Sequence, residues 1–467
     1  MVAVSRKFPT LNPSGPAMPR KNSIDRRLFL SQCAVSSIAA VQFGNVLACN
    51  AEEVREIPAP VPSESLEVGK PYAGWKEGEL DLHFIYTGNA ESCFHIYPDG
   101  TSMLLDAGDY RRKDSTIQLP DDSRRSGEWI ARYVERVNPS GKKVDYLMCS
   151  HFHSDHCGGG NFFAGKTEGR GNDYDLGGAA QVGEFLRFGE AFDRSYPDYE
   201  APVTAMKQRE TLNWLKFVEY QEKTNGLKRM PFTVGRADQL VLKKDPQKYA
   251  GRFQILNVCG SGTVCLEAPK PEQEFDPTVK LPTENLYLKY PNNKTGRVNE
   301  NPLSIGFRLS YGPFRFFTGG DLSGVVLDEN GKDIGIEAIV GRTVGKVSVC
   351  KANHHASRDA MRPEFVQAVQ ARVYVNNVWT PGHVNEHTMK TMCSRELYPG
   401  ERLICPTYCD PEKMKRLADE AWQKDLVKLG GHVVVKAYEE GRRFKVYYLT
   451  ANDESMTVKA VFGPFDA

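Results

Sequence analysis

Residues 149–159 hold the densest group of metal-binding side chains in the chain. The segment reads Cys-Ser-His-Phe-His-Ser-Asp-His-Cys-Gly-Gly, so three of the ten histidines, His151, His153 and His156, fall within six residues together with Asp155. Imidazole and carboxylate groups are suitable ligands for a first-row divalent ion. The apolar run 144–148 predicts a strand directly before them, and a loop at a strand end can direct these donors at one point. We therefore predict a metal site here, in preference to a solvated histidine-rich loop.

Further candidate donors share one position in the sequence, directly after a predicted strand. They are Cys259 after 253–258, Asp321 after the hairpin 304–309 and 314–317, His354 and His355 after 347–352, and His383 and His387 after 373–379. Sheet proteins build sites where several strand ends meet at one edge. We expect these side chains to lie close to the histidine cluster.

The elements that must position these donors alternate between strands and helices. Strands are predicted at 80–86, 94–97 and 102–106, followed by a helix at 129–137 and the strand 144–148. Residues 161–235 and 262–299 are predicted to be insertions, and the first would contain an amphipathic helix from Val203 to Glu222. Its predicted buried face is formed by Met206, Leu212, Leu215 and Val218. Residues 401–467 are expected to add a helix near 411–427 and a β-hairpin, packed on the same domain.

The first fifty residues have the composition of an export signal. They carry six basic side chains and one acidic one, followed by an apolar stretch, and residues 25–30 (Asp-Arg-Arg-Leu-Phe-Leu) resemble a twin-arginine motif. Residues 51–79 begin with a Pro-rich run and are predicted to be a tether. Residues 46–49 resemble a lipoprotein box, which makes Cys49 a possible lipid anchor, although simple cleavage near Ala48 is favoured. The expected location is periplasmic or extracellular.

The charge and cysteine content exclude two classes of protein. The full chain has a formal charge of +1, and residues 1–50 contribute a net +5, so the mature protein carries about −4. This charge argues against a general nucleic-acid binder, and no stripe of Lys and Arg interleaved with aromatic residues lines the predicted loops. Nine of the eleven cysteines remain after Cys49, at spacings that do not indicate a disulfide framework. For Cys393, Cys405 and Cys409, buried thiols are favoured over a bridge or a minor metal site.

Several ordered motifs between residues 80 and 400 resemble the metallo-β-lactamase superfamily. They are Gly88-Asn89-Ala90-Glu91-Ser92, residues 104–109 (Leu-Leu-Asp-Ala-Gly-Asp), the histidine cluster, the hairpin ending at Asp321, and residues 353–357 (Asn-His-His-Ala-Ser). The resemblance implies an α/β fold, the four-layer αββα sandwich, here with insertions. Within the superfamily the chain looks most like the metallohydrolase domain of the DNA-uptake competence proteins and its stand-alone secreted relatives.

The resemblance also implies two divalent metal ions, zinc with manganese as the alternative. The implied ligands are His151 and His153 for one ion, Asp155, His156 and His355 for the other, and Asp321 between the two. His355 is preferred over His354, which would be a packed neighbour, and Asp106 would support the cluster from behind. The superfamily commonly supplies one more histidine to the first ion, yet no histidine lies between His156 and His354. Cys259 is the candidate replacement; a buried cysteine with water or substrate oxygen at the ion, or a single ion in the second site, are the alternatives.

The function implied by this resemblance is hydrolysis by a metal-activated hydroxide. Asp155 and His387 are the catalytic candidates, His387 as the group that assists the leaving group and His383 as its rival. The expected substrate is a phosphodiester or related phosphoric ester, small or surface-attached. The alternatives are lactam or lactone hydrolysis, and a non-catalytic metal-binding module that has lost a ligand.

Overall fold

The computed structural model describes residues 65–110, 118–159, 174–205, 208–268, 276–290 and 299–467. By its internal contacts the chain divides into residues 1–56 and residues 57–467, and all described residues belong to the second unit. The predicted export signal, Cys49 and the start of the tether lie outside the described residues. Among the helices that are described, none has the length and apolar character needed to cross a membrane.

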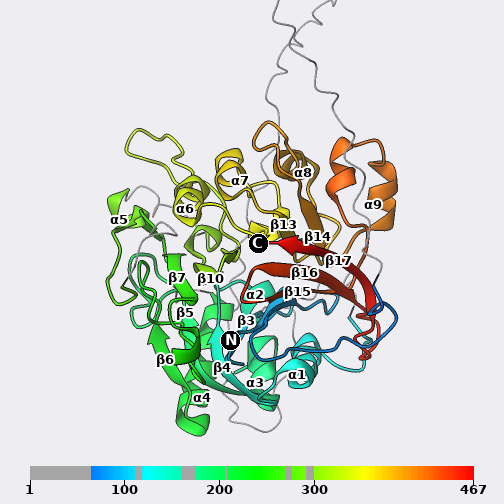
Figure 1. Ribbon diagram of the computed structural model, residues 1–467. Helices are drawn as coiled ribbons and strands as arrows, with labels where there is room; N and C mark the ends of the chain where they lie inside the picture. The colour runs from blue at the N-terminus through cyan, green and yellow to red at the C-terminus, as the bar shows by residue number, and fades with distance from the viewer. Residues whose placement is uncertain (1–64, 111–117, 160–173, 206–207, 269–275, 291–298) are drawn as a thin grey trace, which may run out of the picture. The chain divides into compact units, whose positions relative to one another are not determined.

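Two mixed β-sheets form the centre of the fold (Figure 1). The first has nine strands in the spatial order β17 (Val458–Asp466), β16 (Arg443–Leu449), β15 (His432–Tyr438), β1 (Leu80–Phe84), β2 (Ser92–Ile96), β3 (Ser102–Ala107), β4 (Lys143–Met148), β5 (Arg187–Asp193) and β6 (Lys228–Pro231). The second has eight, in the order β14 (Leu403–Pro406), β13 (Val373–Asn376), β12 (Val349–Lys351), β11 (Phe314–Thr318), β10 (Gly306–Tyr311), β7 (Phe253–Gly260), β8 (Thr263–Cys265) and β9 (Thr283–Asn285).

Helices cover the outer face of each sheet. Those on the first sheet are α1 (Ser126–Val137), α3 (Ala179–Phe185) and α4 (Arg209–Asn225), and those on the second are α6 (Ile336–Val344), α7 (Pro363–Val369) and α8 (Glu386–Met392). Figure 1 shows the two groups of helices on opposite sides of the sheets. The remaining helical segments are short: α2 (Ser154–Cys157), α5 (Leu286–Lys289), α9 (Pro411–Arg416), η1 (Gln247–Tyr249), η3 (Asn301–Leu303), η4 (Asn353–Ala356) and η5 (Ala421–Asp425).

The three largest hydrophobic clusters of the described residues reflect the alternation of side chains along the strands. Leu105 of β3 points into the cluster between the sheets, whereas its neighbour Leu104 packs against the helices. In β15, Val433 and Val435 join the inner cluster and Val434 the outer one. The third cluster lies between the second sheet and its helices. The fold is therefore the expected αββα sandwich.

The region predicted to be the first insertion is in part a continuation of the first sheet. It supplies β5 and β6, which pair in parallel with β4 and with each other. No strand was predicted here because β5 (Arg-Phe-Gly-Glu-Ala-Phe-Asp) lacks the regular apolar pattern that marks a strand.

Helix α4 begins later than predicted and buries a different face. It starts at Arg209 and is anchored by Trp214, Phe217 and Val218, whereas Leu212 is 41% exposed. Phe217 lies directly over Gly183 of α3, where a Cβ atom would come within 2.4 Å of the ring. The packing of this large aromatic side chain decides which face is buried. Met206 lies outside the described residues.

The C-terminal residues complete both sheets. The predicted hairpin corresponds to β15 and β16, and β15 pairs with β1, so the last strands are integral to the first sheet. Strand β14 pairs with β13 of the second sheet. In place of the helix predicted at 411–427 there are two short segments, α9 and η5. All nine cysteines after Cys49 are free thiols.

Candidate metal centre

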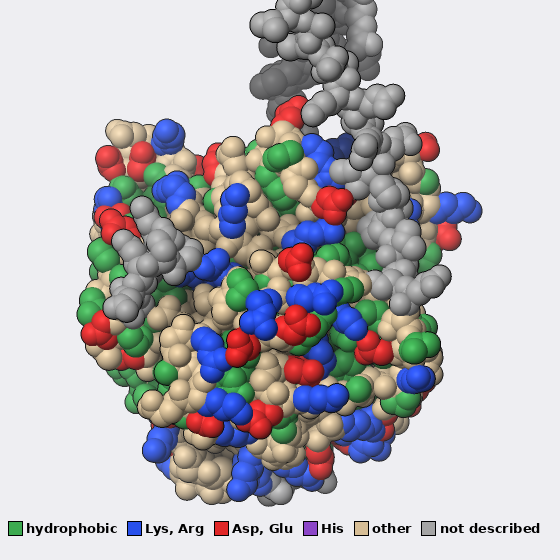
Figure 2. Space-filling model, in the orientation of Figure 1, with side chains coloured by type: hydrophobic (Ala, Val, Ile, Leu, Met, Phe, Trp, Pro, Cys, Tyr) green, Lys and Arg blue, Asp and Glu red, His purple; other side chains and the backbone are tan. Residues whose placement is uncertain are grey.

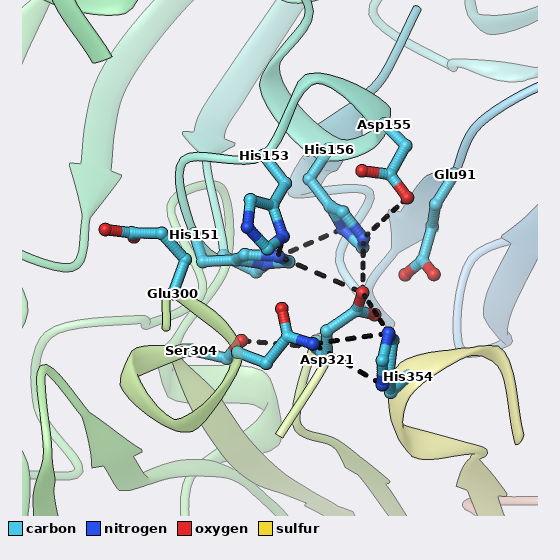
Figure 3. A network of polar contacts seen from close by, with 12 residues as sticks. Glu91, His151, His153, Asp155, His156, Glu300, Ser304, Asp321 and His354 are labelled. Carbon is cyan, nitrogen blue, oxygen red and sulfur yellow. Dashed lines mark hydrogen bonds and ion pairs between the residues drawn. The ribbon is translucent and has the colours of Figure 1, made fainter. Parts of the chain in front are cut away.

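Most of the predicted donors meet at one edge of the two sheets. The histidine cluster follows β4, Asp321 follows β11, and His355 lies in η4 after β12. Strands β3 and β4 are parallel, as are β11, β12 and β13, so their carboxyl ends reach the same edges of their sheets. Figure 3 shows the side chains of His151, His153, Asp155 and His156 directed toward Asp321.

The loop that carries the cluster is held close to the end of β3. The amide of Glu91 donates to the carbonyl of Asp155 (2.9 Å), and the amide of Asp109 donates to the carbonyl of Ser154 (3.0 Å). A Cβ atom on Gly108 would lie only 1.9 Å from the carbonyl oxygen of Asp155. Glycine at this position is therefore required for the close approach of the two segments.

One set of four donors has the spacing of a tetrahedral metal site. Nε2 of His156 lies 3.1 Å from Oδ2 of Asp321 and 3.9 Å from Oδ2 of Asp155. Nε2 of His355 lies 3.4 Å from each of the same two oxygens. Ligands of a tetrahedral zinc ion with bonds of about 2.0–2.1 Å are about 3.3 Å apart. The four side chains therefore fit around a single divalent ion.

A second set shares the same oxygen of Asp321. Nε2 of His151 lies 3.0 Å from Nδ1 of His153 and 3.9 Å from Oδ2 of Asp321. Two imidazole nitrogens at this separation suit a common ion. The two sets of donors thus meet at one carboxylate oxygen.

Hydrogen bonds on the far side of the imidazoles fix their orientation. Nδ1 of His156 lies 2.8 Å from Oδ2 of Asp106. The same carboxylate accepts two hydrogen bonds from Ser150, whose amide donates to Oδ1 and whose hydroxyl donates to Oδ2 (2.7 Å each). Nδ1 of His355 lies 2.8 Å from the carbonyl of Asn377. Nε2 of both histidines is buried and has no hydrogen-bond partner among the described residues. A proton held on Nδ1 leaves the Nε2 lone pair available to an ion.

The carboxylates create a field that favours positive charge at this point. Burial by itself lowers the pKa of His355, but Asp321 and Asp155 outweigh it and raise that pKa to about 9. Burial likewise opposes the charged form of His156, and Asp321, Asp106 and Asp155 raise its pKa well above the usual value. In contrast, burial and the neighbouring His156 and His153 lower the pKa of His151, so its ring is neutral. The same field would stabilise a divalent cation.

Two buried charged residues that the sequence did not predict lie behind this group. Nζ of Lys351 is 2.9 Å from Oε2 of Glu91, and both side chains are fully buried. Lys351 also donates to the carbonyl of Gly320 (2.7 Å) and lies 3.8 Å from Oδ1 of Asp321. Glu91, His156, Asp321 and His355 form a buried group whose donor atoms lie within 4.8 Å of one another. The signal for Lys351 was a charged residue inside an otherwise apolar strand, directly before the two histidines.

The structure does not bring Cys259 to the metal centre. Its thiol lies in the apolar cluster between the second sheet and the helices, 3.7 Å from the carbonyl of Ser304. Burial raises the pKa of this thiol to about 12, which disfavours the thiolate that binds zinc. The position of Cys259 after a strand was a misleading signal because its side chain points to the helix side of the sheet.

Of the two late histidines, the structure brings His383 and not His387 to the centre. His387 is exposed on α8. The ring of His383 is buried and stacks on His355, with the ring centres 4.4 Å apart and the planes 9° from parallel. Trp379 meets His383 edge-on at 5.0 Å. The choice between the two could not be made from the sequence, since both lie in the same segment after β13.

His354 is the more exposed of the two adjacent histidines, at 24%. Its Nδ1 lies 2.7 Å from Oδ1 of Asp359 and 3.2 Å from the hydroxyl of Ser323. Its Nε2 lies 3.9 Å from Oδ2 of Asp321. His354 is therefore an oriented neighbour of the shared carboxylate.

The comparison with protein families agrees with the fold and the site. Residues 86–169, from the end of β1 through the histidine cluster, match the model of the metallo-beta-lactamase superfamily. No curated protein matches the chain. The sandwich, the family match and the buried donor group together indicate a metal-dependent hydrolase of the metallo-β-lactamase fold.

Proposed function

We propose that this protein is a two-metal hydrolase that cleaves a phosphodiester or a related phosphoric ester. The observation that supports two ions is the position of Asp321, whose Oδ2 lies 3.1 Å from Nε2 of His156 and 3.9 Å from Nε2 of His151. His151 and His153 would hold one ion, and Asp155, His156 and His355 the other, with Asp321 common to both. Zinc is the proposed metal and manganese the alternative, since imidazole and carboxylate ligands suit either.

Divalent ions bound here would activate water as the nucleophile and neutralise the negative charge that develops on the ester. The residues of the chain then have distinct tasks. Asp106 and the carbonyl of Asn377 hold the imidazoles of His156 and His355 in the orientation that directs Nε2 at Asp321. Lys351 balances the charge of Glu91 and Asp321, so we assign Glu91 to support of the centre and not to metal binding. His354 is placed to contact the substrate, because its ring is partly exposed beside Asp321.

The preference for a phosphoric ester rests on the sequence motifs that resemble the competence-protein type. Long nucleic acid is disfavoured by the charge of the mature chain, and basic and acidic side chains are interspersed on the face shown in Figure 2. A small or surface-attached ester is therefore proposed. We also propose that the protein acts outside the cytoplasm, with residues 1–50 as the export signal and Cys49 as a possible lipid anchor.

The alternative is a non-catalytic metal-binding module. Among the described residues, three donors, His151, His153 and Asp321, surround the proposed first ion, in contrast to four at the other ion. This difference would be expected if the first ion had been lost, although water can complete a catalytic site.

The test is turnover and metal content of the purified mature protein after loading with zinc or manganese. We expect hydrolysis of bis-p-nitrophenyl phosphate to exceed that of p-nitrophenyl phosphate, a β-lactam and a homoserine lactone. Asp321→Ala should abolish both activity and binding of at least one ion, whereas Asp328→Ala, in the turn that follows β11, should preserve both. Bound metal, one ion or two, without turnover of any substrate would favour the non-catalytic module. Preferential lactam or lactone hydrolysis would refute the phosphoric-ester proposal.

A further inference from the structure

Three consecutive residues of the segment after β12 have left-handed backbone conformations. The φ angles are 44° for His354, 52° for His355 and 54° for Ala356. None of these residues is glycine, and a residue with a Cβ atom is disfavoured in this region. Such a turn persists only where its surroundings enforce it. Because the turn directs His355 and His354 toward Asp321, whatever enforces it also determines the geometry of the metal centre.

A buried carboxylate on α6 ties the two ends of this segment together. Glu337 is 1% exposed. Its Oε1 accepts from Nδ2 of Asn353 (2.8 Å) and from the amide of Met361 (2.9 Å), and its Oε2 accepts from the amide of Arg362 (3.1 Å). Asn353 precedes the turn, and the other two residues follow it. One carboxylate therefore closes residues 353–362 into a loop on the helix.

The chemistry of these contacts requires a carboxylate. Three donors point at two oxygens, so an amide or a protonated acid would place a donor against a donor. The guanidinium of Arg362 does not neutralise the charge directly, since it pairs with Asp333 (2.5 Å) and only its backbone amide contacts Glu337. Burying a carboxylate among neutral donors costs free energy. A contact that served stability alone would therefore not be expected to use one at this loop.

We propose that Glu337 is a positioning residue of the metal centre, which holds the left-handed turn at His354, His355 and Ala356 and thereby directs Nε2 of His355 at Asp321. The inference depends on the proposed metal centre. It assigns Glu337 no contact with an ion or a substrate. Its effect passes through the backbone of the turn, while the carbonyl of Asn377 orients the ring of His355 itself.

The test compares Glu337→Gln with Glu364→Gln, an exposed acid in the first turn of the neighbouring helix α7. Zinc affinity is measured by competition with a chelator, and the ligand geometry by the visible spectrum of the cobalt-substituted protein. Loss of a supporting hydrogen bond behind a metal ligand typically costs about 10- to 100-fold in affinity. We expect Glu337→Gln to weaken binding of the ion at His355 by about this factor and to change the cobalt spectrum. Glu364→Gln should alter neither.

A second substitution separates positioning from simple stability. Ala356→Gly relieves the backbone strain of the turn, because glycine adopts positive φ freely. Adding Ala356→Gly to Glu337→Gln should restore a large part of the lost affinity, whereas a purely structural role for Glu337 predicts no such rescue. If Glu337→Gln does not fold, Glu337→Asp with and without Ala356→Gly makes the same comparison.

Unchanged affinity and spectrum in a folded Glu337 variant would overturn the inference, as would the absence of rescue by Ala356→Gly. If the wild-type protein binds no ion, it is the proposed function that fails. The two failures are therefore distinguishable in the same titration.

Discussion

Lys351 and Glu91 form an ion pair at 2.9 Å in which both side chains are completely buried, directly behind the metal-binding group. Burial by itself lowers the pKa of Lys351, but Glu91 and Asp321 raise it above its usual value. The ammonium therefore remains charged and offsets the negative charge of the carboxylates around it. A centre with several buried carboxylates can then fold before it binds an ion.

The first prediction concerns this pair. Lys351→Met should reduce the free energy of unfolding by about 3–5 kcal/mol, because it leaves a buried carboxylate without its counter-ion. The double variant Lys351→Met with Glu91→Gln should lose less than the sum of the two single variants. Urea unfolding of the metal-free proteins measures both. Lys223→Met serves as the control, since the Lys223–Glu219 pair is 71% and 54% exposed and exposed pairs contribute little to stability. Additive losses in the double variant would contradict the coupling.

The second prediction concerns Asp106. This residue has a φ of 58°, so Asp106→Asn is the suitable change because Asn tolerates that conformation. It replaces one acceptor oxygen with an amide group and should weaken zinc binding by about 10- to 100-fold. Chelator competition measures the affinity. Asp99→Asn is the control, since Asp99 is buried in a turn and binds Thr101 and the amide of Lys244. Asp99→Asn should lower the free energy of unfolding and leave the zinc affinity unchanged. Equal losses of zinc affinity in Asp99→Asn and Asp106→Asn would show that the effect of Asp106 is not local.

The third prediction concerns Cys259. The thiol lies in an apolar cluster, so Cys259→Ser should leave the metal stoichiometry unchanged and lower the free energy of unfolding by about 1 kcal/mol. His153→Ala, in contrast, should reduce the stoichiometry from two ions towards one. Metal analysis of the purified proteins gives the result. A lower stoichiometry in Cys259→Ser would restore this residue as a ligand of the first ion.

The fourth prediction compares the two histidines after β13. His383 stacks on His355 and supports its ring, so His383→Ala should reduce kcat/KM or zinc affinity by about 10- to 100-fold. His387 is exposed, and His387→Ala should change either quantity by less than about 2-fold. Steady-state kinetics with bis-p-nitrophenyl phosphate and chelator competition for zinc decide between them. A large loss in His387→Ala alone would support the assignment of His387 as the leaving-group donor.

The fifth prediction is a pH dependence of stability. Burial raises the pKa of Glu337 from 4.5 to about 7, although Asn353 and the amides of Arg362 and Met361 oppose this shift. The folded state therefore holds the proton more tightly than the unfolded state. The stabilising contribution is fully present below about pH 4.5 and is lost as the pH rises through about 7, and it amounts to about 3 kcal/mol.

Urea unfolding of metal-free protein between pH 5 and 8 measures this contribution. As the pH rises from 5 to 8, the free energy of unfolding of the wild type should fall by about 3 kcal/mol more than that of Glu337→Gln. Glu364→Gln should follow the wild type. Parallel curves for the wild type and Glu337→Gln would show that Glu337 does not titrate in this range. The expected loss in the wild type would show that the carboxylate of Glu337, which accepts the hydrogen bonds of the turn, lowers the stability of the fold when it is charged.

The local part of the metal centre could be predicted from the sequence because its ligands are close in the chain. His151, His153, Asp155 and His156 share one loop after a strand, so their types and spacing alone indicate an ion site. The alternation of apolar residues predicted most strands. The αββα architecture itself was inferred from the family resemblance, and the two sheets and their helices agree with it.

Tertiary structure decided everything that depends on contacts between distant segments. Glu91 and Lys351 come from different sheets, and only the packing of those sheets makes them a pair. The same packing turns Cys259 into the apolar cluster on the helix side of the second sheet and places His383, not His387, against His355. Sequence spacing sets which residues share a loop or a strand face. Which side chains from separate strand ends meet is set by sheet order and register, which follow from burial summed over the whole core.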